Sequence, residues 1–170
     1  MASSGGARGA LLFVAGAAAF VASLVVAGNE FPRRVPIHFD LSGDPDQYLA
    51  RADALVLMSI VALAGGLVFG LLGAGATRIP VRMFNVPERD WWAATPEREA
   101  ELRRRMRTDM YGFGGVFLLF LAGLTLLTLR ASRMADPHLD GWFVALLVGF
   151  AVVVVGWVVF LVRVRYRRTD

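Results

Sequence analysis

The stretch GALLFVAGAAAFVASLVVAGN, residues 9–29, decides the fold class, because 21 consecutive residues carry no charged side chain. A helix needs about 20 apolar residues to cross the hydrocarbon core of a bilayer. Three further uncharged stretches of similar length follow at 54–77, 110–129 and 141–162. Since lipid offers no partners to backbone amides, such stretches cross only as helices. We therefore predict an all-α membrane protein, a single domain over 1–170 with four transmembrane helices.

The composition agrees with this prediction. The 170 residues are 56% hydrophobic, with a mean hydropathy of +0.56, whereas soluble domains are roughly 45–50% apolar. Four spans leave room for loops and one small cytoplasmic segment, which excludes a separate soluble catalytic domain. The sequence contains no cysteine, which excludes disulfides, thiolate zinc sites and a cysteine nucleophile. Its richness in Ala, Gly, Val and Arg is typical of a GC-rich bacterial genome.

The arginines predict the orientation. All 18 basic residues are Arg, and 13 of them lie in the two termini and in the loop 78–109. The remaining five lie in or beside the loops 30–53 and 130–140. The positive-inside rule therefore places both termini and the loop 78–109 in the cytoplasm of a bacterial cytoplasmic membrane. Because the arginines flank apolar runs, they indicate lipid rather than nucleic acid as the partner.

The first span has a second interpretation. Arg8, the apolar run and the Val25-Val26-Ala27 end also fit a secretory signal cleaved after Ala27. Cleavage would leave three spans with the same downstream orientation, and the mass of the mature protein distinguishes the two.

The spans carry no Asp, Glu, Lys, Arg or His. Proton relays and charged-substrate pathways usually place such groups within the membrane. We therefore expect neither an enzyme nor a proton-coupled transporter, and no cofactor. In the second span, small residues recur every four positions at Ala62, Gly66, Gly70 and Ala74, a pattern that favours close packing against another helix.

The outer loop 30–53 contains the residues that could bind a ligand. Pro32 and Pro36 favour an extended path. The sequence SGDPD after it predicts a tight turn, with a positive φ at Gly43 and with Asp44 or Asp46 capping the next helix. The candidate ligand-binding residues are Pro36, His38, Phe39, Asp40, Gly43, Asp44, Pro45, Asp46 and Tyr48.

This loop also suggests a metal site, although weakly. His38 and Asp40 would share one face of an extended segment, and with Asp44 and Asp46 they could hold a divalent cation. The simpler interpretation makes the aspartates turn and cap formers, so we expect no metal.

The cytoplasmic loop 78–109 predicts a helix that leads into the third span. Thr95 and Pro96 suit its N-cap and first position, and acids precede arginines at four-residue spacing. The arginines would face anionic lipid. Alternatively, the loop docks a cytoplasmic protein through Trp91, Trp92, Pro96, Glu97 and Glu101.

Two segments together resemble a known family. RVPIHFDLSGDPDQY after the first span is similar to the P-x-H-F-x-x-x-G-x-P-D-x-[WY] segment of a bacterial membrane-protein family of unknown function. NVPERDWWAATPERE resembles a second stretch of that family's short, roughly four-span members. The domain is also similar to the N-terminal part of the immunity and signalling membrane protein of the Bacillus sporulation-delay toxin system. The matching positions are Pro36, His38, Phe39, Gly43, Pro45, Asp46, Tyr48, Asn85, Pro87, Trp92, Pro96 and Glu97.

Two functions fit these observations. The first is a non-enzymatic sensor or immunity-type protein, whose outer loop recognises an envelope ligand or extracellular peptide and whose cytoplasmic loop recruits a protein. The second is an accessory or assembly subunit of another membrane complex, such as a transporter.

Overall fold

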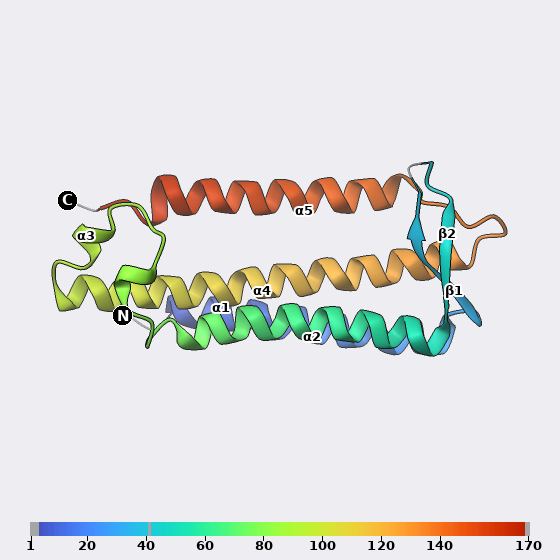
Figure 1. Cartoon of the computed structure of the whole chain (residues 1–170), viewed down its shortest axis with the longest axis horizontal. Helices are drawn as coiled ribbons and strands as arrows, with labels where there is room; N and C mark the ends of the chain where they lie inside the picture. The colour runs from blue at the N-terminus through green and yellow to red at the C-terminus, as the bar shows by residue number, and fades with distance from the viewer. Residues whose placement is uncertain (1–3, 41, 169–170) are drawn as a thin grey trace.

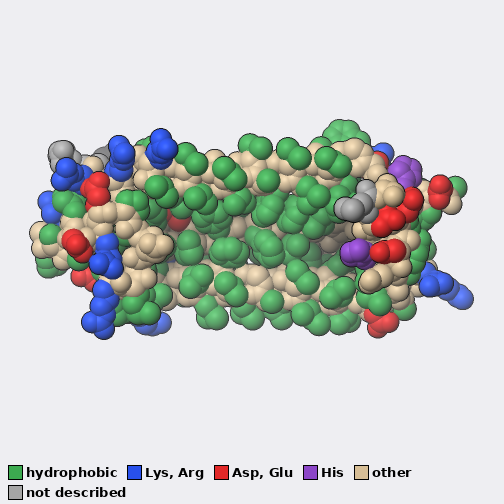
Figure 2. All heavy atoms as spheres, turned by 45° about the horizontal axis from the view of Figure 1, so that its top comes forward, with side chains coloured by type: hydrophobic (Ala, Val, Ile, Leu, Met, Phe, Trp, Pro, Cys, Tyr) green, Lys and Arg blue, Asp and Glu red, His purple; other side chains and the backbone are tan. Residues whose placement is uncertain are grey.

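Four long helices run along the longest axis of the molecule (Figure 1). The computed structural model describes residues 4–40 and 42–168. The helices are α1 (Ser4–Glu30), α2 (Arg51–Gly75), α4 (Pro96–Ser132) and α5 (Gly141–Phe160), and α5 continues into a π-helical turn, η2 (Leu161–Arg165). All four are long and apolar enough to cross a membrane, as predicted. Apolar side chains cover the middle of the molecule, and charged ones gather mostly at its two ends (Figure 2).

One end of the bundle carries a β-hairpin, and we call it the hairpin end. Its strands are β1 (Arg34–Phe39) and β2 (Pro45–Ala50), which pair antiparallel. The first strand agrees with the extended path predicted from the prolines. The helix cap predicted at Asp44 or Asp46 is wrong, because β2 intervenes and α2 begins after Ala50 without a side-chain cap.

The other end, which we call the Arg-rich end, holds both chain termini (Figure 1). The connection from α2 to α4 forms two short turns here, η1 (Val81–Met83) and α3 (Arg89–Trp92). The Thr95 side chain accepts a hydrogen bond from the Arg98 amide, and Pro96 opens α4, so this helix start is as predicted. From there α4 continues without a break through the third predicted span, because no proline or turn sequence interrupts it.

Helices α1 and α4 are in direct backbone contact. A Cβ built at Gly16 would collide with the carbonyl oxygen of Gly115, and one at Gly9 with that of Thr108. Glycine is therefore required for this approach. Beside the contact lies a buried cluster that also involves α2: Phe20, Ala62, Leu118 and Ala122.

The predicted small-residue stripe on α2 packs only in part. Ala62 is buried, and Gly66 and Gly70 have room for a Cβ beside Leu118 and Phe13, whereas Ala74 is exposed. The tightest positions on α2 lie elsewhere, since a Cβ at Gly65 or Gly73 would press on Phe117 or Tyr111. Gly65 and Gly73 lie outside the predicted four-residue stripe, although they are the α2 glycines that lie against Phe117 and Tyr111 of α4.

Helix α5 stands beside α4 and buries none of its residues. Stacked rings connect the two helices: Phe113 with Trp157 at 4.6 Å between centroids, and Phe120 with Phe150 at 4.1 Å. Cavities lie between α4 and α5 toward each end of the bundle.

Candidate functional site

The hairpin turn is built around the Asp40 carboxylate. This group accepts hydrogen bonds from the Ser42 amide at 2.8 Å and the Asp44 amide at 3.1 Å. Gly43 has a φ of +89°, which confirms the positive φ predicted from the sequence. Its carbonyl accepts a hydrogen bond of 2.9 Å from the Leu139 amide. The turn is therefore fixed internally and docked on the loop that precedes α5.

His38 and Asp46 form a hydrogen bond across the hairpin, with 2.6 Å between Nδ1 and Oδ1. Both side chains are about half exposed, so water screens the pair and its contribution to stability is small. The carboxylate of Asp40 is instead used by the turn. Among the described residues, no three His, Asp or Glu side chains are grouped as a metal site.

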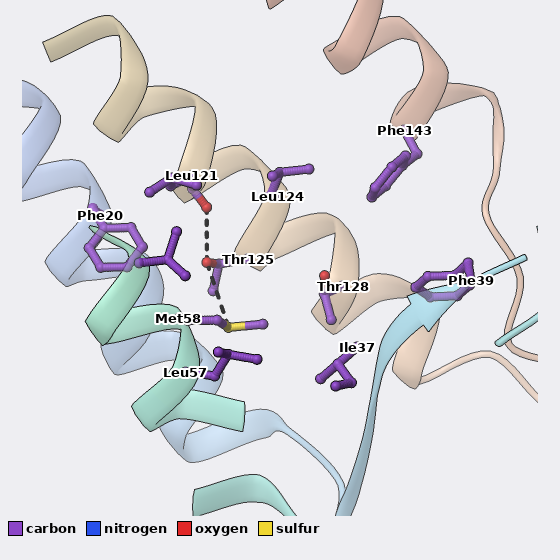
Figure 3. Close-up of a pocket in the computed structure, with 11 residues that line it drawn as sticks. Phe20, Ile37, Phe39, Leu57, Met58, Leu121, Leu124, Thr125, Thr128 and Phe143 are labelled. Atoms are coloured by element: carbon purple, nitrogen blue, oxygen red, sulfur yellow. Dashed lines mark hydrogen bonds between the residues drawn. The ribbon is translucent and has the colours of Figure 1, made fainter. Parts of the chain in front are cut away.

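An apolar pocket of about 270 Å³ opens where the hairpin meets the helices (Figure 3). Phe39 from β1 and Phe143 from α5 stand at one end of it, with 6.4 Å between ring centroids. The buried Thr125 hydroxyl donates to the Leu121 carbonyl at 2.9 Å, so its proton is already used within α4. The lining residues are Phe20, Ile37, Phe39, Leu57, Met58, Val61, Leu121, Leu124, Thr125, Thr128 and Phe143.

The chemistry of this lining favours an apolar guest. It carries no charged side chain. Small-molecule pockets hold roughly 300–1,000 Å³. At about 270 Å³ this pocket lies just below that range, and it suits one or two apolar side chains. The exposed hairpin residues His38, Asp46 and Tyr48 do not line it.

The structure places the nine ligand-binding residues predicted from the sequence in three different settings. Only Phe39 lines the pocket. Pro36 and Gly43 are buried and shape the hairpin. The other six lie on its surface, most of them exposed: His38, Asp40, Asp44, Pro45, Asp46 and Tyr48.

Most pocket residues were missed, because they come from four helices and look like any other residue of a span. Ile37 is the exception that could have been found. It alternates with His38 along an extended segment and so points to the opposite face.

A second cluster of side chains ties α5 to α4 at the Arg-rich end. The Tyr166 hydroxyl donates to Asp109 Oδ2 at 2.7 Å, and Arg165 Nε donates to the same oxygen at 2.6 Å. The indole Nε1 of Trp92 donates to the Tyr166 carbonyl at 3.0 Å. Burial and the nearby Asp109 carboxylate raise the pKa of Tyr166 well above its ordinary value, so its hydroxyl stays protonated and remains a donor.

Three of the residues predicted to dock a cytoplasmic protein make contacts within the chain instead. Trp92 is only 1% exposed, and Glu101 pairs with Arg104 and Arg105. Trp91 is half-buried under Arg98, whose guanidinium lies 4.1 Å from its ring centroid. Pro96 and Glu97 are exposed at the start of α4.

The fold and these sites define a class: a helical protein with four potential membrane-spanning helices, compatible with a multi-pass membrane protein. Residues 14–63 match a domain of unknown function (DUF1648). The match covers the whole hairpin, most of α1 and the first half of α2. No curated protein and no solved structure matches the chain.

Proposed function

We propose that this chain is a non-enzymatic protein of the bacterial cytoplasmic membrane that recognises a hydrophobic envelope peptide at its hairpin end. The apolar pocket beneath the hairpin is the observation that carries the proposal. It accepts an apolar side chain, and its lining carries no charged group that would favour a polar ligand instead. The excess of arginine at the other end supports an outward position for the hairpin.

The hairpin is suited to recognition because it is held on both sides. Leu139 binds the turn, and β1 packs Val35 into a buried cluster with Phe31, Ala54 and Leu129. A preformed pocket loses little conformational entropy when it binds. The hairpin sequence resembles a family whose domain is similar to the N-terminal part of a toxin-immunity protein, and this favours a peptide as the ligand.

Photocrosslinking in native membranes tests this function. A photoreactive amino acid at Leu57, a pocket residue with 41% exposure, should capture a peptide or protein of defined mass. The matched control is Leu63, which is 64% exposed on α2 and does not line the pocket. It should capture lipid only. Identical products at both positions would contradict peptide recognition in the pocket.

The alternative function, an accessory subunit of another membrane complex, is favoured by α5. This helix buries no residue within the chain, and its apolar side chains are available to a neighbouring helix. Purification of the tagged protein in mild detergent distinguishes the two. An accessory subunit would be recovered together with the subunits of a transporter or another membrane complex, in a fixed molar ratio to them.

A further inference from the structure

Two adjoining cavities open at the Arg-rich end, on the side of α4 that faces α1 and α5. They measure about 450 Å³ and 340 Å³. Thr108, Phe160 and Arg165 line both, so the cavities form one groove that extends along α4. This groove lies at the opposite end of the bundle from the hairpin pocket.

The groove is positively charged. Its charged lining consists of four arginines and two carboxylates: Arg8, Arg104, Arg105, Arg165, Glu101 and Asp109. Arg165 is bound to Asp109, and Arg105 is bound to Glu101 and to a backbone carbonyl. Arg104 shares Glu101 but is 53% exposed, and Arg8 has no ion pair with any described residue. The positive charge in excess is thus located on Arg8 and Arg104.

The same groove becomes apolar toward the middle of the bundle. Leu12 lies one turn beyond Arg8 on α1, and Trp157 lies one turn before Phe160 on α5. All three apolar side chains line the larger cavity. A ligand that fills the groove therefore meets cationic groups at the end and hydrocarbon-like surface further in.

We infer that the groove binds one anionic phospholipid, with its phosphate facing Arg8 and Arg104 and an acyl chain along Leu12 and Trp157. Arginine is well suited to phosphate because its planar guanidinium donates several hydrogen bonds. A free phosphate would use the arginines alone, whereas a phospholipid also uses the apolar wall. The inference shares the membrane setting of the proposed function but is independent of the hairpin pocket.

Native mass spectrometry of the detergent-solubilised full chain tests this site. The probes are phosphatidylglycerol, phosphatidylcholine of the same chain length, and glycerol 3-phosphate. We expect phosphatidylglycerol to bind as a single tight adduct, phosphatidylcholine to bind at least about tenfold more weakly, and glycerol 3-phosphate not to compete. Equal binding of the two lipids, or competition by glycerol 3-phosphate, would overturn the assignment.

Matched double variants locate the binding. Arg8→Gln with Arg104→Gln should weaken phosphatidylglycerol binding about tenfold or more. Arg163→Gln with Arg167→Gln removes the same charge from exposed residues at the same end that line neither cavity, and should change binding less than about threefold. Equal losses in the two variants would show a nonspecific charge effect and overturn the site.

A charge-preserving variant excludes misfolding as the cause. Arg8→Lys with Arg104→Lys should keep most of the phosphatidylglycerol binding, with a circular dichroism spectrum like that of the native protein. A loss as large as in the Gln variant would overturn the charge-based account. Because none of these measurements involves the peptide, failure here leaves the crosslinking result at Leu57 as a separate test of the proposed function.

Discussion

Gly43 is the residue on which the hairpin turn most depends. Its φ of +89° is a conformation that β-branched residues resist, and it is buried against Leu139. Local chemistry was enough to predict this, because SGDPD is a turn sequence in any context. By contrast, the partner of Asp46 lies eight residues away, and turn chemistry could not predict it.

We expect Gly43→Val to lower the free energy of unfolding by about 1–3 kcal/mol, because a β-branched residue is strained at this positive φ. Chemical denaturation in detergent micelles, followed by circular dichroism, measures the change. The control is Gly141→Val, where a Cβ meets no atom within 4 Å and little change is expected. Equal stability of the two variants would remove the positive φ as the reason for glycine at position 43.

At the scale of elements, the contact of α1 with α4 determines how the bundle packs. We expect Gly115→Ala to destabilise the protein by about 1–3 kcal/mol, because its Cβ would lie 2.5 Å from the Leu12 carbonyl oxygen. Gly66→Ala is the matched control, since its Cβ would lie 3.8 Å from Leu118, and alanine favours the helix by roughly 0.5–1 kcal/mol. In thermal unfolding, the melting temperature of Gly115→Ala should fall and that of Gly66→Ala should stay equal or rise. A Gly115→Ala protein as stable as Gly66→Ala would contradict the backbone contact.

Hydropathy predicted the four helices because crossing a membrane requires a continuous apolar run. It could not predict which glycines face another helix, since lipid-facing and helix-facing positions in a span are both apolar. The second strand was missed for another reason. Pro45 and Asp46 have low strand propensity, and β2 forms only because β1 provides a partner. The pocket is lined by β1 and four helices that only the fold brings together. Phe39 was therefore the one lining residue named from the sequence, although the strand alternation could also have indicated Ile37.

At the scale of the whole molecule, we propose that the hairpin end faces outward and the Arg-rich end faces the cytoplasm. An envelope peptide reaches only the outer side of the membrane, so its recognition requires an outward-facing hairpin. A phospholipid can bind the Arg-rich groove in either orientation, provided that the groove lies at the level of the lipid headgroups. The distribution of arginine predicts the orientation, and the separation of the two charged ends along the helices makes it measurable.

Labelling of single cysteines in intact cells measures this orientation most directly, because the native chain contains no cysteine. Ser42→Cys reports on the hairpin turn, and Ala94→Cys reports on the Arg-rich end without disturbing the Thr95 cap; both positions are exposed. We predict that a membrane-impermeant maleimide labels Ser42→Cys in whole cells and labels Ala94→Cys only after the membrane is permeabilised. Labelling of Ala94→Cys but not Ser42→Cys in whole cells would contradict the orientation and, with it, the proposed recognition of an envelope peptide.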